Sequence, residues 1–124
     1  MGSTTNINVE VFMCNNDLEI DEAADLYTVL IQELTECINE LKKSVKERDI
    51  KSTQKNLHNI KGITSSYRLI NVYEIASTIY TQLKAGMIKN IEDTSNKLIE
   101  EVKSEQNRIL QYFSNAGIIL EVEK

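Results

Sequence analysis

No proline occurs anywhere in the 124 residues of this chain. Proline ends or kinks helices because it lacks a backbone N–H and its ring clashes with the preceding turn. A chain without proline and with only four glycines is suited to long, uninterrupted helices rather than to a loop-rich sandwich or a low-complexity chain. The length is that of one domain.

Apolar residues recur at steps of three and four along most of the chain, which is the repeat of an amphipathic helix. The pattern predicts four helices, over about 21–47, 50–67, 72–85 and 91–116. Gly86 and Gly117 follow the last two, where a left-handed residue commonly ends a helix. Because the connections are short, we expect an all-α fold, an up-down-up-down antiparallel four-helix bundle over residues 21–117.

Polar residues stand where these helices should begin. Asp21, Asp49 and Asn90 can each accept a hydrogen bond from the free backbone N–H groups of a first turn. Asn71 followed by Glu74 resembles a capping box, which predicts that the third helix opens there.

Short extensions flank the bundle at 1–20 and 118–124. Both contain apolar residues that alternate with polar ones, a pattern typical of extended segments: Ile7, Val9 and Val11, then Leu120 and Val122. The extensions could pair as a small two-stranded patch, or a short helix over 9–14 could cover one end of the bundle. We favour the simplest interpretation, a frayed N-terminal arm and a C-terminal tail that is a linker toward a further domain.

The composition excludes several classes of function. The net charge of −5 argues against nucleic acid as a partner, since phosphate binding needs a basic face. No apolar run is long enough to cross a bilayer, and the N-terminus has no secretory pattern. Cys14 and Cys37 are far apart and there is one histidine, too few ligands for a zinc site of usual spacing. Two reduced thiols in a cytoplasmic protein are expected.

His58 is the only histidine, and helical spacing puts it on a polar face. The core stripe of its helix contains Leu57 and Ile60. The residues that share a face with His58 are polar or small: Lys51, Gln54, Lys55, Lys61, Gly62 and Ser65. We therefore expect the imidazole at the solvent-facing edge of the bundle. A lone surface histidine is also compatible with no function.

Gly62 lies one helical turn after His58. Glycine inside a helix costs about 1 kcal/mol relative to alanine, and its missing side chain clears the surface beside the imidazole for another protein. Tertiary packing could equally tolerate it. Lys61 can contact an oxygen of an anion on the ring, and Ser65 can donate a hydrogen bond nearby. Lys55 adds to the basic character of this face, which attracts an acidic partner.

The run HNIKG at His58–Gly62 resembles the motif of the histidine-phosphotransfer (HPt) domain family of two-component phosphorelays, His-x-hydrophobic-Lys-Gly followed by small residues. Asp49, nine residues earlier, is similar to the helix-capping Asp of that family. The order and lengths of the predicted helices also fit, so the resemblance covers about 21–113.

The resemblance implies that His58 is the phosphorylated nucleophile, which accepts a phosphoryl group from a histidine kinase or a receiver-domain aspartate and passes it to a response-regulator receiver aspartate. The supporting residues that it implies, together with those suggested by their place on the same face, are Lys61, Gly62, Gln54, Lys55 and Ser65. Such a chain is a phosphocarrier rather than an enzyme. It needs no ATP site and no cofactor of its own, because Mg²⁺ comes with the partner receiver domain.

Two departures from the family concern docking. Arg68 stands where the family often has a glycine, and Ile63 is bulkier than the usual residue. Tyr27, Ile31 or Ile63 could supply apolar surface to a partner. Two alternatives therefore stay open: a helical docking or dimerisation module that is not phosphorylated, and the phosphorylatable domain of a larger chemotaxis-type kinase.

Overall fold

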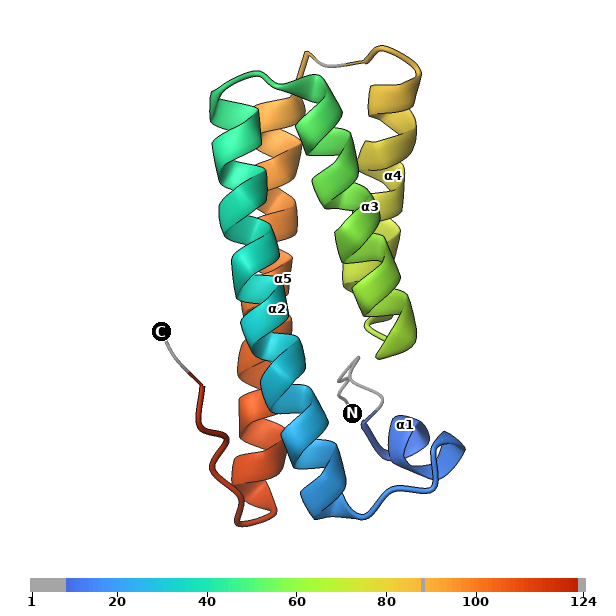
Figure 1. The fold of residues 1–124 in the computed structure, drawn as a ribbon, viewed down its shortest axis with the longest axis vertical. Coiled ribbons are helices and arrows are strands. Elements are labelled where there is room, and N and C mark those ends of the chain that lie inside the picture. The colour runs from blue at the N-terminus through green and yellow to red at the C-terminus, as the bar shows by residue number, and fades with distance from the viewer. Residues whose placement is uncertain (1–8, 88, 123–124) are drawn as a thin grey trace.

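A computed structural model describes residues 9–87 and 89–122, and it is all-helical there, as predicted. Five helices are present in these ranges rather than four (Figure 1). Their bounds are α1 Val9–Asn15, α2 Ile20–Lys46, α3 Ile50–Ser66, α4 Ile70–Lys84 and α5 Ile91–Asn115.

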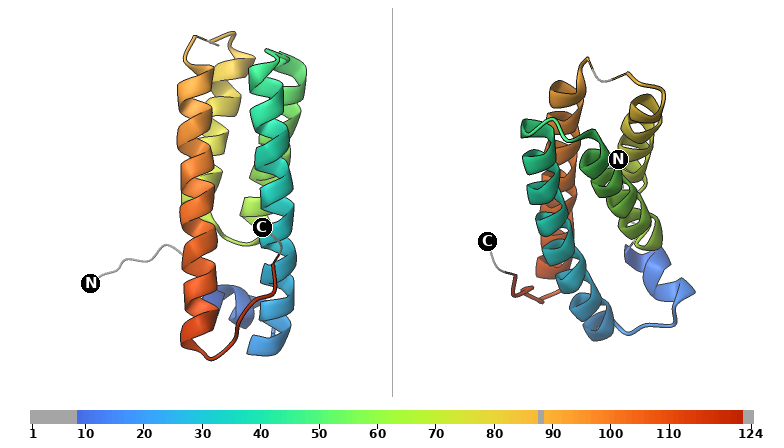
Figure 2. Two further views of the ribbon diagram at one scale, coloured as in Figure 1. Left: turned by 90° about the vertical axis from the view of Figure 1, so that its left-hand side faces the viewer. Right: turned by 45° about the horizontal axis from the view of Figure 1, so that its top comes forward.

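The four long helices lie side by side and alternate in direction (Figures 1 and 2). α3 packs against α2 and α4, and α5 packs against the same two helices from the other side. α2 and α5 extend past α3 and α4 at one end of the molecule, and α1 lies in the space that this leaves (Figure 1). The added helix therefore covers one end of the bundle.

The core is the shared apolar stripe of these helices. Fully buried side chains come from each long helix: Leu30, Leu34 and Leu41, Leu57 and Ile60, Val72 and Ala76, Leu98, Val102 and Ile109. One apolar residue that continues the three-and-four spacing of α2 is not in the core. Leu26 is 38% exposed, whereas its neighbour Tyr27 is fully buried, because the stripe drifts around the helix by part of a residue each turn.

Aromatic side chains fill the end of the bundle that α1 covers. The Phe12 ring of α1 stacks on Tyr67 at 5.1 Å and meets Tyr27 edge-on at 5.4 Å, and Phe113 lies 5.6 Å from Tyr27. These centroid distances are typical of favourable aromatic pairs. Burial of Phe12 and Val9 against this cluster explains how a helix as short as α1 is held.

Neither the extended interpretation nor the favoured frayed arm holds for residues 9–15, and the alternative of a short helix over 9–14 is confirmed. Val9 and Val11 lie on helix α1, and residues 118–122 form no strand. Leu120 is buried against the bundle instead of pairing with another segment. The predicted position of Ile7 lies outside the described residues.

Each of the five helices ends in the same hydrogen-bonded motif. In each, the backbone N–H of the second residue after the C-cap donates to the carbonyl of the residue five positions earlier, as Leu69 N does to Thr64 O at 2.9 Å. The residue in between is left-handed in every case: Asp17, Arg48, Arg68, Gly86 and Gly117. The two glycine predictions are confirmed, and Arg68 occupies a conformation that favours glycine.

The helix starts agree less well with prediction. Asp49 is an N-cap, and its carboxylate accepts from Ser52 N at 3.1 Å. α2, however, begins with a capping box between Glu19 and Glu22, so Asp21 is not the cap. α4 begins after Leu69, and Asn71 and Glu74 form no capping box. Asn90 holds the N-cap position of α5 without a side-chain hydrogen bond.

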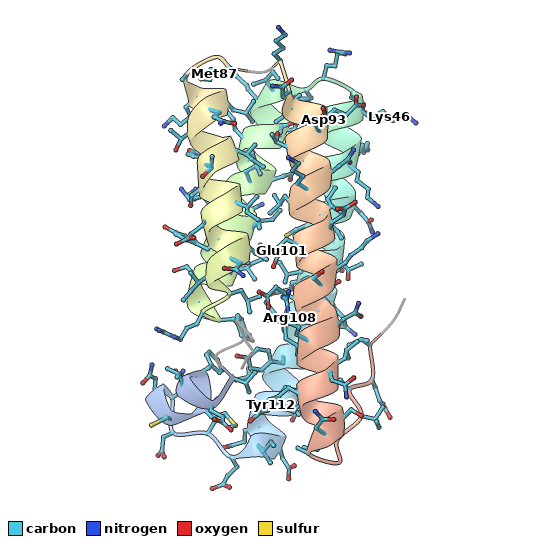
Figure 3. The ribbon with its side chains drawn as sticks, turned by 180° about the vertical axis from the view of Figure 1, so that it is seen from behind. Lys46, Met87, Asp93, Glu101, Arg108 and Tyr112 are labelled. Atoms are coloured by element: carbon cyan, nitrogen blue, oxygen red, sulfur yellow. The ribbon has the colours of Figure 1, made fainter. Side chains whose placement is uncertain are left out.

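Among the described residues, one charged side chain is inside the bundle. Glu105 of α5 is fully buried, and Arg108 is the partner of its carboxylate. Arg108 Nη1 lies 3.3 Å from Glu105 Oε2 and 3.5 Å from Glu101 Oε2, on the same helix (Figure 3). Burial raises the pKa of Glu105, the Arg108 charge opposes this, and Glu101 adds to it.

Candidate functional site

The sequence of α3 fixes which of its faces turns outward. Its buried residues, Thr53, Leu57, Ile60 and Thr64, follow one another at steps of four and three. The inward Thr64 hydroxyl is satisfied by donating to Ile60 O at 2.7 Å. His58 is not part of this buried stripe and is exposed, as the sequence predicts.

His58 lies at an open groove between α2 and α3, which we call the His58 groove. Its lining residues are Glu33, Glu36 and Cys37 of α2, His58, Asn59, Gly62, Ile63 and Ser66 of α3, and the following Tyr67. The imidazole is therefore accessible from solvent and has a surface beside it on which another molecule can rest.

The α2 wall of this groove is acidic. Glu33 and Glu36 line it, and the Cys37 thiol is half-buried between them and the core. Burial raises the pKa of Cys37, and Glu33, Glu36 and Glu40 add to that effect. The thiol therefore stays protonated at neutral pH and is a poor nucleophile.

The opposite side of His58 faces α4, and the charged side chains on that side are basic. The Tyr80 ring lies 6.1 Å from the imidazole, measured between centroids, with the planes tilted by 41°. Lys61 Nζ lies over the same Tyr80 ring at 4.6 Å, and Lys84 Nζ lies 5.4 Å from its centroid. Lys61 is thus beside His58 but is directed toward α4 and does not line the groove.

Gly62 leaves the groove open next to the imidazole. A Cβ built on this residue would meet no atom within 4 Å, and its φ is not in the left-handed region. Neither packing nor backbone conformation therefore requires glycine here. Glycine in a helix costs about 1 kcal/mol relative to alanine, and no contact within the described residues offsets that cost.

The remaining predicted residues lie farther from the groove. Lys55 is exposed and Gln54 is half-buried, one turn before His58, and neither lines the groove. Ser65 lines a separate hollow with Arg68, near the start of α4. The structure therefore gathers His58, Lys61 and Gly62 closely and leaves Ser65 apart.

Of the three apolar side chains expected at a docking surface, two are not accessible. Tyr27 is fully buried and Ile31 is 4% exposed, because both belong to the core stripe of α2. Ile63 does line the groove. The residues that the sequence did not indicate are Glu33, Glu36, Cys37, Tyr67 and Tyr80.

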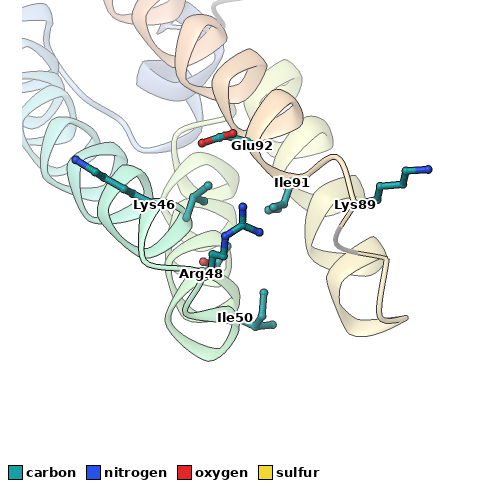
Figure 4. A pocket seen from close by; sticks show the side chains of 8 residues that line it. Lys46, Arg48, Ile50, Lys89, Ile91 and Glu92 are labelled. Atoms are coloured by element: carbon teal, nitrogen blue, oxygen red, sulfur yellow. The ribbon is translucent and has the colours of Figure 1, made fainter.

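Another hollow lies at the end of the bundle where the α2–α3 connection meets the start of α5 (Figure 4). Arg48 is directed toward Ile91 there, whereas the Lys46 and Lys89 side chains extend away from the hollow (Figure 4). The basic side chains do not converge on one point, so this hollow does not form an anion site.

Other chemistry is not visible in the described parts of the chain. Within residues 9–87 and 89–122, no three His, Cys, Asp or Glu side chains gather where they could hold a metal ion. None of the helices in those ranges combines the length and apolar character that crossing a bilayer requires.

Comparison with known proteins relates this arrangement to one solved domain. No family model matches the chain, and no curated protein matches it in sequence. In structure it is similar to the crystal structure of the HPt domain from the Hpt sensor hybrid histidine kinase of Shewanella, with a TM-score of 0.74. The likeness covers 89% of this chain and 95% of that domain, at 14% sequence identity. The protein therefore has the HPt-domain fold.

Proposed function

We propose that this chain is a histidine-phosphotransfer domain that carries a phosphoryl group on His58. The observation that carries the proposal is the place of the only histidine: exposed at mid-helix, beside an open groove, in a fold that is similar to a solved HPt domain. On this proposal residues 21–117 are the working unit, an up-down-up-down four-helix bundle to which α1 and the C-terminal tail are added.

The transfer uses the imidazole as a nucleophile. A neutral ring nitrogen attacks phosphorus, the new N–P bond forms, and the bond between phosphorus and the donor's aspartate oxygen breaks, leaving a carboxylate. The reverse step passes the group to a receiver aspartate. Most of the stabilisation of the transferring group comes from the partner, which supplies the Mg²⁺ and the aspartate. The chain itself is then a carrier without an ATP site.

The neighbours of His58 have distinct tasks in this proposal. The Lys61 ammonium meets a phosphoryl oxygen, and Gly62 lets the partner approach the ring. Gln54 and Lys55 support the partner from the preceding turn. Ser65 contributes at the margin, since the structure places it in a different hollow.

The partner is a receiver domain or a histidine kinase in the cytoplasm, and it docks over the His58 groove. The acidic α2 wall and the basic side at α4 give this surface two differently charged borders. A partner with complementary borders docks in one orientation, because the reversed orientation would bring like charges together.

The test is transfer from a phosphorylated receiver or kinase to the wild-type chain and to His58→Gln. We expect label on the wild type that is lost in acid and kept in base, and none on His58→Gln. Ser104→Gln, an exposed change on α5, serves as the matched control and should be labelled normally. Circular dichroism establishes that all three proteins are folded.

Two other results have clear meanings. Binding of receivers without labelling of the wild type would favour the docking module over the carrier. Labelling by an ATP-charged kinase domain but by no receiver would identify the chain as the phosphorylatable part of a larger kinase.

A further inference from the structure

The Tyr80 ring is shared by three groups of the candidate site. It lies 6.1 Å from the imidazole of His58, 4.6 Å from Lys61 Nζ and 5.4 Å from Lys84 Nζ. Two of these groups come from α3 and one from α4, so a half-buried side chain of α4 links both helices at the histidine.

The ring attracts both lysines. The negative face of an aromatic ring attracts an ammonium group within about 6 Å of its centroid, and both Nζ atoms lie inside that distance. No salt bridge to Lys61 or Lys84 occurs in the described part of the chain. The Tyr80 ring, itself next to His58, is therefore the group in this part of the chain that attracts both ammonium groups.

A phosphoryl group on His58 would change these interactions. It brings negative charge and acceptor oxygens to an imidazole that shares the Tyr80 ring with two ammonium groups, neither of which forms an ion pair within the described residues. Long lysine side chains lose rotamer freedom when they are fixed. If the ring already restricts them, less of that entropy is lost when the phosphoryl group arrives.

We propose that Tyr80 is a positioning residue of the His58 site, whose ring holds Lys61 and Lys84 beside the imidazole so that both can meet the phosphoryl oxygens. The inference rests on the proposed function of His58 and adds two residues to it. It assigns the task to the ring, since the Tyr80 hydroxyl makes no hydrogen bond within the described residues.

The assignment to the ring sets the choice of variants. Tyr80→Phe keeps the ring and should behave as wild type. Tyr80→Leu keeps an apolar side chain of good helix propensity but removes the ring. Lys84→Gln removes one ammonium group, and Lys103→Gln on the exposed face of α5 is the control for loss of a charge elsewhere.

The first measurement needs no phosphorylation. His58 gives the only histidine ring signals of the chain, and Tyr80 shifts them and the Lys61 ε-methylene signals by its ring current. We expect both sets to move toward their free values in Tyr80→Leu and to stay in Tyr80→Phe. Equal spectra of these residues in the two variants would overturn the inference and leave the proposed function untouched.

The second measurement is the rate at which phosphoramidate, a small anionic donor, phosphorylates His58. Tyr80→Leu and Lys84→Gln should each slow it about two- to fivefold, the factor that a partly exposed cation–π contact supplies. Tyr80→Phe and Lys103→Gln should match wild type. Slowing by Tyr80→Phe equal to that by Tyr80→Leu would refute the assignment to the ring. A wild type that accepts no phosphoryl group from phosphoramidate or from any protein donor overturns the proposed function itself.

Discussion

The same substitution should have opposite effects at two glycines of this chain. Gly62 is inside α3 with open space where a Cβ would stand, so Gly62→Ala gains helix propensity of about 1 kcal/mol. Gly86 has a φ of +82°, where alanine is strained by about 1 kcal/mol or more. For 124 residues, the entropy of unfolding converts 1 kcal/mol into about 4 °C in Tm.

The assay is thermal and urea unfolding of wild type, Gly62→Ala and Gly86→Ala, followed by circular dichroism. We expect Tm to rise in Gly62→Ala and to fall in Gly86→Ala. A loss of stability in Gly62→Ala would show that the space beside Gly62 is not open and would refute the reasoning. The Gly86→Ala variant guards against the simpler idea that any glycine-to-alanine change stabilises the chain.

The stabilised variant should also be the less active one. A methyl group at Gly62 stands in the His58 groove and displaces a docked partner, and an error near 1 Å in position can slow a transfer strongly. We expect transfer from a receiver to fall on the order of tenfold, whereas the small donor phosphoramidate should react with Gly62→Ala as with wild type. Unchanged transfer from the receiver would mean that Gly62 clears no path for a partner.

Three further outcomes follow from the structure. Glu105→Gln should raise stability at neutral pH, because the raised pKa of the buried carboxyl makes folding progressively less favourable as pH rises above its ordinary 4.5. Urea titrations should show the gain shrink as pH falls through 4.5 and vanish about one unit lower, where the wild-type carboxyl is protonated in both states. Arg48→Gly should raise the unfolding free energy by about 1 kcal/mol, since the φ of Arg48 is +57°, and a lower value would contradict this. Peptide mass spectrometry should find Cys14 alkylated before Cys37 at pH 7.5, because burial and three glutamates raise the pKa of Cys37.

The positions of the helices and the exposure of His58 could be predicted from sequence, because both depend on local patterns of residues. The spacing of apolar residues located the four long helices to within about two residues at each end, and it placed His58 on the exposed face. The cap of α3 at Asp49 was also predictable, since a carboxylate one residue before a helix has few other uses.

Features that depend on contacts between helices were missed. Val9 and Val11 alternate like a strand, but burial of Phe12 against two aromatic rings, Tyr27 of α2 and Tyr67 just after α3, makes the segment helical. A period of two over so few residues is a weak signal beside tertiary packing. Glu105 was also missed, although it lies three residues after Val102 and four before Ile109, on the buried stripe of α5; a charged residue is rarely assigned to a core.

Tyr80 could have been found by counting along the helical hairpin. His58 lies eleven residues before Leu69 in the α3–α4 connection, and Tyr80 lies eleven residues after it. Antiparallel helices rise equally per residue, so residues equally far from a tight turn lie at the same height. Applied to the α2–α3 connection, the same rule places Cys37 at the height of His58. The height follows from sequence, but the direction of each side chain does not.

Tyr67 belongs to two parts of the molecule at once. Its ring stacks on Phe12 of α1, and it also lines the His58 groove. A substitution at Phe12 therefore changes the packing of a ring that lines the His58 groove. On the proposed function, selectivity for a partner then depends partly on α1, and a protein engineered to carry the His58 face on another scaffold would have to include α1.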